Sequence, residues 1–240
     1  MKLSDKLGCL VRIAAAFCTA QAAGIVLMYL LDGLADGYWY NILLNAICTL
    51  GTNAAAFVLI CGRGKLPKSH NYTVWELPAF FFGGVFLACL AGYLAKLLPV
   101  NNTAALPQGN DLILYAAYTL ILSPIAEEIA FRGAALPYLR SAFDFYGAAF
   151  ISAVLFAAYH MSLLQLPYTF VVGFCLAIVA QRSGSIIPCI ILHALNNLLT
   201  LGAALSHTLA AITDFALPIL GAAGIIFIIV TRRYLPNTND

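Results

Sequence analysis

The chain has 240 residues, of which 62% are hydrophobic and only 9% are charged. Soluble domains average roughly 25% charged residues, so this composition excludes an ordinary soluble domain and is typical of a polytopic membrane protein. Twelve Lys and Arg residues against ten Asp and Glu residues leave a near-neutral balance without a basic, aromatic-interleaved cluster, so we expect no nucleic-acid partner.

Apolar runs separated by polar, Gly or Pro residues predict eight membrane-spanning helices. About twenty residues suffice to cross the hydrocarbon core, and the first run is long enough to be a retained helix rather than a cleaved signal peptide. In chain order the predicted spans are 10–31, 40–61, 76–98, 111–131, 145–161, 166–181, 185–204 and 212–231. The sequence therefore predicts an all-α membrane bundle that forms one transmembrane domain over residues 1–240.

The distribution of basic residues predicts the orientation of this bundle. Cytoplasmic loops of membrane proteins carry the excess of Lys and Arg. Basic residues lie at both chain ends and near 63–68, 132–140 and 182, whereas the loops at 32–39, 99–110 and 205–211 hold none. Lys96 is the exception, and its long side chain can reach the outer interface. We therefore expect both termini in the cytoplasm.

The first polar motif, Glu127-Glu128-Ile-Ala-Phe-Arg132, ends the fourth predicted span. Helical residues four apart share a face, so Glu128 is predicted to pair with Arg132, while Glu127 points about 100° away. A carboxyl group partly withdrawn from water has its pKa raised toward neutrality, which suits a general base. At ~1.5 Å per residue, Glu127 should lie within about one turn of the end of its span. The alternative is an interfacial charge cluster that merely ends the helix.

The second motif is Phe156-Ala-Ala-Tyr-His160, near the outer end of the fifth predicted span. Phe156 lies one turn before His160 on the same face, so its ring is expected to shield the imidazole from lipid and fix its orientation. The imidazole of His160 could hold the water molecule that Glu127 deprotonates. The alternative is a histidine that only packs inside the bundle.

The third motif, His193-Ala-Leu-Asn196-Asn197, lies in the seventh predicted span. His193 and Asn197 are four residues apart, and both can donate hydrogen bonds to an oxyanion in a water-poor cavity. Asn196 could share that face. The alternative is that these side chains form hydrogen bonds between membrane helices.

In this order, on successive hydrophobic segments, the three motifs resemble the signature of the CAAX protease and bacteriocin-processing (CPBP) family. These intramembrane endopeptidases include the type II CAAX prenyl endopeptidases. The resemblance covers residues 111–200, the motif-bearing catalytic core, and implies an eight-helix bundle whose polar cavity opens to the cytoplasm. It further implies that Glu127 is the general base, that His160 helps to activate water, and that His193 and Asn197 stabilise the oxyanion. Glu128 and Arg132 are then supporting structure.

The resemblance is compatible with two mechanisms, one that uses a zinc ion and one that uses no metal. The family has also been described as metal-dependent, and Glu127, His160 and His193 would be the ligands of a zinc ion with water in its open position. The metalloprotease pattern H-E-x-x-H is absent, and the seven cysteines form no C-x-x-C pair. We favour metal-free activation of water and no cofactor, with zinc as the alternative.

The expected substrate is a membrane-associated peptide or a prenylated or otherwise lipidated protein. The lipid bilayer is the expected surroundings of both enzyme and substrate. We expect an integral protein of a prokaryotic plasma membrane. One alternative function is a non-catalytic membrane protein, either for bacteriocin immunity or as a scaffold. Another is a proton-coupled transporter in which Glu127, His160 and His193 form a proton relay.

Overall fold

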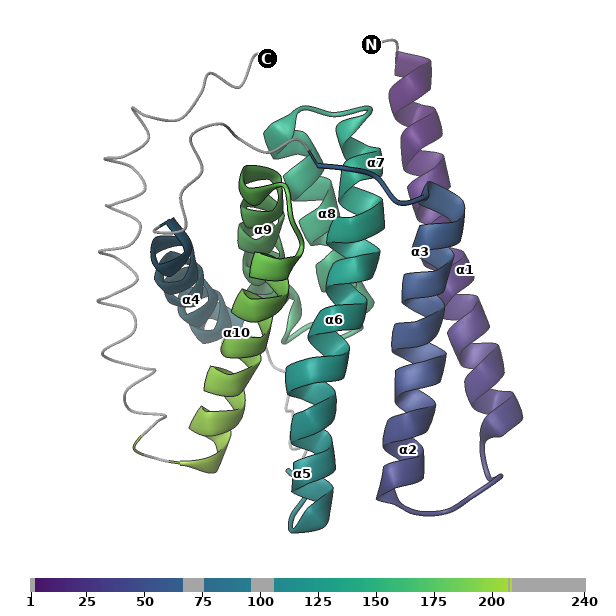
Figure 1. The fold of residues 1–240 in the computed structure, drawn as a ribbon, viewed down its shortest axis with the longest axis vertical. Coiled ribbons are helices and arrows are strands. Elements are labelled where there is room, and N and C mark those ends of the chain that lie inside the picture. Colours follow the sequence, from purple (N-terminus) through teal and green to yellow (C-terminus); the bar gives the residue numbers. More distant parts are fainter. Residues whose placement is uncertain (1–2, 67–75, 96–105, 207, 209–240) are drawn as a thin grey trace. The chain divides into compact units, whose positions relative to one another are not determined.

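A computed structural model of the chain describes residues 3–66, 76–95, 106–206 and 208 (Figure 1). Every regular element in these ranges is helical, which confirms the predicted all-α class. Within the described ranges five helices are long and apolar enough to cross a membrane, so the chain is an integral membrane protein. They are Leu3–Leu31, Tyr38–Cys61, Asn110–Arg140, Leu166–Ser183 and Ile187–Leu205.

Two further apolar helices correspond to the third and fifth predicted spans. They are α4 (Glu76–Ala95) and α8 (Phe145–Tyr159). The predicted eighth span, 212–231, lies outside the described residues. The total of eight spans and the orientation of the bundle therefore stay predictions, as does the single domain over residues 1–240.

The chain divides into two compact units, the first made of residues 1–65 and 105–144 and the second of residues 66–104 and 145–240. In the first unit, α1 (Leu3–Leu31) packs against the second span, which consists of α2 (Tyr38–Asn45), the π-helical segment η1 (Ala46–Gly51) and α3 (Thr52–Cys61). The backbones meet at Gly24, where a Cβ atom would lie 2.3 Å from the carbonyl oxygen of Cys48. Glycine at this position therefore permits the close approach.

The remaining helix of the first unit is continuous from Asn110 to Arg140. Its segments are α5 (Asn110–Ala117), η2 (Tyr118–Leu122), α6 (Ser123–Glu128), η3 (Ile129–Ala135) and α7 (Leu136–Arg140), of which η2 and η3 are π-helical. Pro124 and Pro137 each follow a π segment by two residues. A proline ring clashes with the carbonyl group of the preceding turn, and the wider π turn relieves that clash.

The predicted end of this helix at residue 131 was wrong. Small and apolar residues resume directly after Arg132, whose charge is neutralised within the helix by Glu128, so the helix continues to Arg140. At ~1.5 Å per residue, Glu127 lies roughly 20 Å from that end rather than within one turn of it. The first motif is therefore deep in its span.

The second span and the Asn110–Arg140 helix run in the same direction. Along their lengths α2 contacts α5, η1 contacts α6, and α3 contacts η3 (Figure 1). Phe57 of α3 and Phe131 of η3 are completely buried, with ring centroids 5.4 Å apart. This ring contact fixes the register between the two helices.

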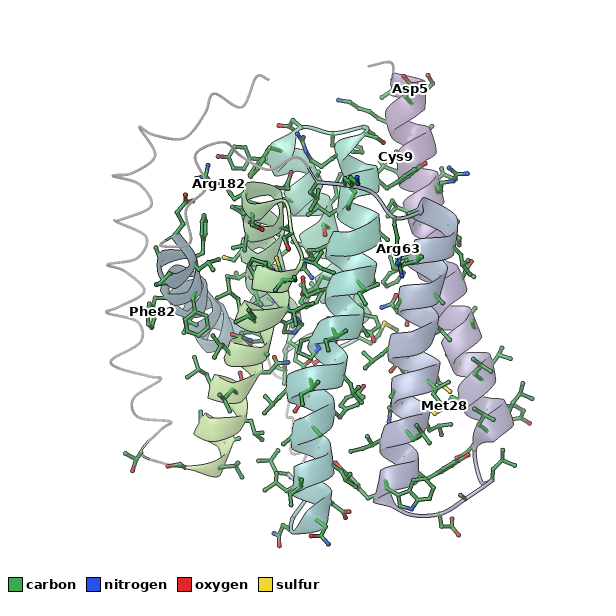
Figure 2. The ribbon with its side chains drawn as sticks, viewed as in Figure 1. Asp5, Cys9, Met28, Arg63, Phe82 and Arg182 are labelled. Carbon is green, nitrogen blue, oxygen red and sulfur yellow. The ribbon has the colours of Figure 1, made fainter. Side chains whose placement is uncertain are left out.

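In the second unit, α9 (Leu166–Ser183) contacts α4, α8 and α10 (Ile187–Leu205). Proline in the first turn opens both α9 and α10, and Gly184 ends α9 in the left-handed conformation, with φ 65°. Arg182, near the end of α9, forms an ion pair with Glu76 of α4, in which Nη2 lies 2.6 Å from Oε2. Figure 2 shows the side chains of these helices.

Candidate active site

The first motif contains a buried ion pair. Arg132 Nη1 lies 3.0 Å from Glu128 Oε1, and both side chains are 0% exposed. The predicted pairing of Glu128 with Arg132 is confirmed. An interfacial charge cluster does not fit this geometry, because the helix continues to Arg140 and both charges are completely enclosed.

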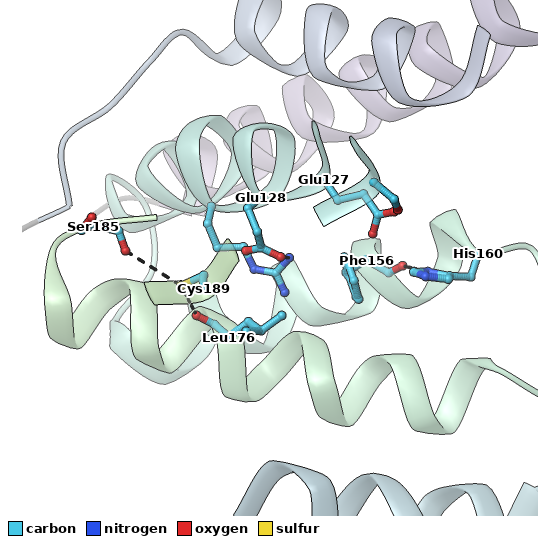
Figure 3. Close-up of polar contacts among 9 residues, drawn as sticks. Glu127, Glu128, Phe156, His160, Leu176, Ser185 and Cys189 are labelled. Carbon is cyan, nitrogen blue, oxygen red and sulfur yellow. Dashed lines mark hydrogen bonds and ion pairs between the residues drawn. The ribbon is translucent and has the colours of Figure 1, made fainter. Parts of the chain in front are cut away.

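Glu127 lies at the end of α6 and is only 5% exposed. Its Oε1 accepts a hydrogen bond from the hydroxyl group of Ser123, one turn earlier on the same helix. Figure 3 shows the Glu127 carboxylate turned away from that of Glu128. Sequence reasoning missed Ser123, although its Ser-x-x-x-Glu spacing was a usable signal. The serine orients one oxygen of the carboxylate and leaves it further capacity to accept hydrogen bonds.

His160 directly follows the last residue of α8, at the end of the fifth predicted span. Its Nδ1 lies 2.8 Å from the carbonyl oxygen of Phe156 (Figure 3). Because a carbonyl oxygen only accepts, Nδ1 carries the proton, and Nε2 of the neutral ring is the nitrogen with a lone pair. The backbone thus selects the tautomer in which Nε2 can accept a hydrogen bond from water.

Phe156 brings the second and third motifs together within the second unit. Its ring meets His160 edge to face with the centroids 4.9 Å apart, and meets His193 of α10 in the same manner at 5.6 Å. Phe156 is 1% exposed and His193 is 4% exposed. Gly173 of α9 makes room for the phenyl ring, since a Cβ atom there would lie 2.9 Å from Phe156 Cδ1. The ring therefore orients both imidazoles.

The two asparagines of the third motif have different surroundings. Asn196 is buried, and its Nδ2 donates a hydrogen bond to the hydroxyl group of Tyr168 on α9. This is the interhelical bond that the sequence offered as an alternative role. Asn197 lies on a different side of α10 and is half-buried. Tyr168 was missed because nothing in the sequence pairs residue 168 with residue 196.

The part of the chain that the structure describes contains no group of three or more His, Cys, Asp or Glu side chains placed to hold a metal ion. Of the predicted zinc ligands, Glu127 belongs to the first unit and His160 and His193 belong to the second. Metal-free activation of water and the zinc alternative both stay predictions, which activity in the presence of a chelator distinguishes.

Residues 109–199 match a protein-family model described as Type II CAAX prenyl endopeptidase Rce1-like. The matched segment contains all three polar motifs, and the match confirms the resemblance predicted from them. The matched family comprises membrane proteases that act on membrane-associated peptide substrates. Comparison with curated proteins and with solved structures gave no match.

Proposed function

We propose that this protein is an intramembrane endopeptidase that hydrolyses a peptide bond of a prenylated or otherwise lipidated, membrane-associated polypeptide. The observation that carries this proposal is the family match, because residues 109–199 include the three motifs in full. The buried carboxylate of Glu127 and the two imidazoles held by Phe156 support it. Each is the type of group that peptide hydrolysis requires.

In the proposed mechanism, Glu127 is the general base. The hydrogen bond from Ser123 holds one carboxylate oxygen, and the carboxylate takes a proton from water as the water oxygen attacks the scissile carbonyl carbon. His160 accepts the second O–H of that water at Nε2, because its Nδ1–H is committed to the Phe156 carbonyl. No covalent enzyme intermediate forms.

His193 and Asn197 have the role of oxyanion stabilisers. As the carbonyl oxygen becomes negative, the imidazole N–H and the side-chain amide donate hydrogen bonds to it. The tetrahedral intermediate then expels the amine, which receives the proton that Glu127 took from water. The new carboxyl terminus contains the oxygen atom of the water, so the atoms balance.

Glu128, Arg132 and Phe156 support the reacting groups in this proposal. The Glu128–Arg132 pair neutralises two charges next to the base, and Phe156 restricts both imidazoles. We further propose that the reacting groups open toward the cytoplasm of a prokaryotic cell. The arrangement of Lys and Arg in alternate loops supports the cytoplasmic orientation.

The experiment that tests this function is a cleavage screen with detergent-purified protein. Wild type and Glu127→Gln are incubated with a pooled library of lipidated and unlipidated membrane peptides, and the products are identified by mass spectrometry. A third incubation contains wild type and a strong chelator. Lys65→Gln is the matched control, because it also replaces a charged side chain by glutamine but lies outside the three motifs.

We expect wild type, with and without chelator, and Lys65→Gln to cleave the same lipidated peptides, and Glu127→Gln to lose nearly all of this cleavage. Loss of cleavage in the chelator would contradict metal-free activation of water. Cleavage by Glu127→Gln at the wild-type rate would remove Glu127 from the mechanism. A folded wild type that cleaves no lipidated or unlipidated peptide would favour the non-catalytic alternative.

A further inference from the structure

Asn53 of α3 is a buried polar residue that the proposed mechanism does not use. Its side chain is 2% exposed, and neither its Nδ2 nor its Oδ1 has a hydrogen-bond partner among the residues that the structure describes. An amide buried without a partner costs on the order of 1–3 kcal/mol in proteins. A group held at that cost inside a membrane helix is a functional candidate.

The side of the helix on which Asn53 lies follows from its neighbours one turn away. Phe57, four residues later, contacts Phe131 of η3. Residues four apart share a helix face, so Asn53 lies on the face turned toward the Asn110–Arg140 helix. Helix α3 also packs against α1, and Thr52, next to Asn53 in the chain, lies beside Gly24 of that helix.

The height of Asn53 along the helix follows from the register. The two helices run in the same direction, and Phe57 is level with Phe131. One turn earlier on each helix are Asn53 and Glu127, which are therefore at the same level. The next residues on this face of the Asn110–Arg140 helix are Ala130, Phe131 and Ala134. They are apolar and cannot bind the Asn53 amide through their side chains.

Tyr118 of η2 lies in the neighbourhood of both Glu127 and the second span. Its phenol interacts electrostatically with Glu127 and lies near Thr49, one turn before Asn53 on the second span. The carboxylate and the Thr49–Asn53–Phe57 face are therefore close to the same phenol. The register therefore makes the Glu127 carboxylate a candidate acceptor for the Asn53 amide.

We propose that Asn53 is the positioning residue for Glu127, donating a hydrogen bond from its amide to the carboxylate during the reaction. This inference rests on the proposed function of Glu127. An ionised carboxylate can accept about four hydrogen bonds, so the bond from Ser123 does not exclude a second donor. Held from two helices, the carboxylate keeps one orientation toward the water that it deprotonates.

The kinetic test replaces Asn53 by residues that keep or remove the amide. Asn53→Leu has a similar size without a donor, and we expect its kcat to fall about 10- to 100-fold while KM stays within about twofold. Asn53→Gln retains the amide and should recover part of the turnover. Asn45→Leu is the matched control, because Asn45 is an exposed amide on the same span that donates to the Asn41 carbonyl.

Wild-type kcat in Asn53→Leu would overturn the inference. Equal losses in Asn53→Leu and Asn53→Gln would also overturn it, because the amide would then be irrelevant. The Asn45→Leu control is expected to cleave at the wild-type rate.

A second test does not depend on proteolysis. The thermal midpoints of Asn53→Leu, Glu127→Leu and the double variant form a double-mutant cycle in detergent. If the amide and the carboxylate interact, the shift of the double variant differs from the sum of the single shifts by about 2–4 °C. Additive shifts would overturn the inference while leaving the proposed function intact. Non-additive shifts in a protein that cleaves nothing would support the contact and contradict the proposed function.

Discussion

Glu128 and Arg132 form an ion pair that water does not reach. Removing one partner of such a pair leaves the other charge buried and uncompensated, which costs about 3–5 kcal/mol, whereas replacing both by apolar residues is often neutral. We therefore expect Glu128→Ala and Arg132→Ala each to lower folded yield and the thermal midpoint. Glu128→Leu/Arg132→Met should recover much of the loss. Differential scanning fluorimetry in detergent measures these shifts.

Asp36→Asn is the control for these variants, because Asp36 is exposed in the loop after α1. Its midpoint should equal that of wild type. Undiminished stability of both single-alanine variants would contradict the energetic importance of the pair.

The neighbouring asparagines of the third motif provide a matched comparison. If Asn197 stabilises the oxyanion, Asn197→Ala should lower kcat by about 10²- to 10³-fold with little change in KM. Asn196→Ala loses its bond to Tyr168 and should lower the thermal midpoint with a smaller change in kcat. Steady-state kinetics and thermal unfolding on both variants separate the two roles. A raised KM with unchanged kcat in Asn197→Ala would reassign that residue to substrate binding.

At the level of single residues, the sequence predicted interactions within one helix better than those between helices. The four-residue spacing of Glu128 and Arg132 predicted their pairing, because both belong to the same helix. The contacts of Asn196 with Tyr168 and of Phe156 with His193 each join separate helices. Helical spacing carries no information on which neighbour a side chain will meet, so these contacts required the structure.

The packing of α8 against α9 depends on the absence of a side chain at Gly173. A Cβ atom there would lie 2.9 Å from Phe156 Cδ1 and 3.4 Å from the Cα atom of Ala153. Overpacking of this kind costs about 1–3 kcal/mol, more than the ~1 kcal/mol that alanine gains over glycine in a helix. Gly173→Ala should therefore lower the thermal midpoint and, by moving the Phe156 ring, lower kcat.

Gly8→Ala is the matched control, since a Cβ atom at Gly8 of α1 would meet nothing within 4 Å. This variant should be as stable as wild type or slightly more so. A Gly173→Ala protein with wild-type stability and kcat would contradict the role assigned to this contact.

The helix between Asn110 and Arg140 is the element that the sequence predicted least well. Composition located its beginning to within a residue, but the charged motif at 127–132 was read as its end. Glu128 neutralises Arg132 within the helix, so the helix can continue past both charges. A hydropathy scale scores each charged residue separately and therefore does not detect such an ion pair. The π-helical segments η2 and η3 were also not predicted, although the two prolines that follow them are visible in the sequence.

For the molecule as a whole, hydrophobicity predicted the all-α class and the approximate positions of the described membrane helices. This succeeds because a bilayer requires long apolar helices whatever their tertiary contacts. The division into two compact units followed from no feature of composition, because it depends on which helices pack together.

The orientation of the bundle can be tested by labelling intact cells with a membrane-impermeant maleimide. Asp36→Cys lies in the loop between the first two spans and Arg63→Cys follows the second. With both termini in the cytoplasm, Asp36→Cys should be labelled above the wild-type background, and Arg63→Cys only after the cells are permeabilised. The reverse pattern would contradict the orientation predicted from the basic residues.

The most direct test of the central claim is cleavage of one lipidated peptide substrate in H₂¹⁸O by wild type and by Glu127→Gln, with single-turnover rates measured by mass spectrometry. If Glu127 is the general base, wild type incorporates one ¹⁸O atom into the new carboxyl terminus per turnover. The rate for Glu127→Gln should then be lower by about 10²- to 10⁴-fold at undiminished folded yield. A Glu127→Gln protein that cleaves the peptide at the wild-type rate would contradict the account.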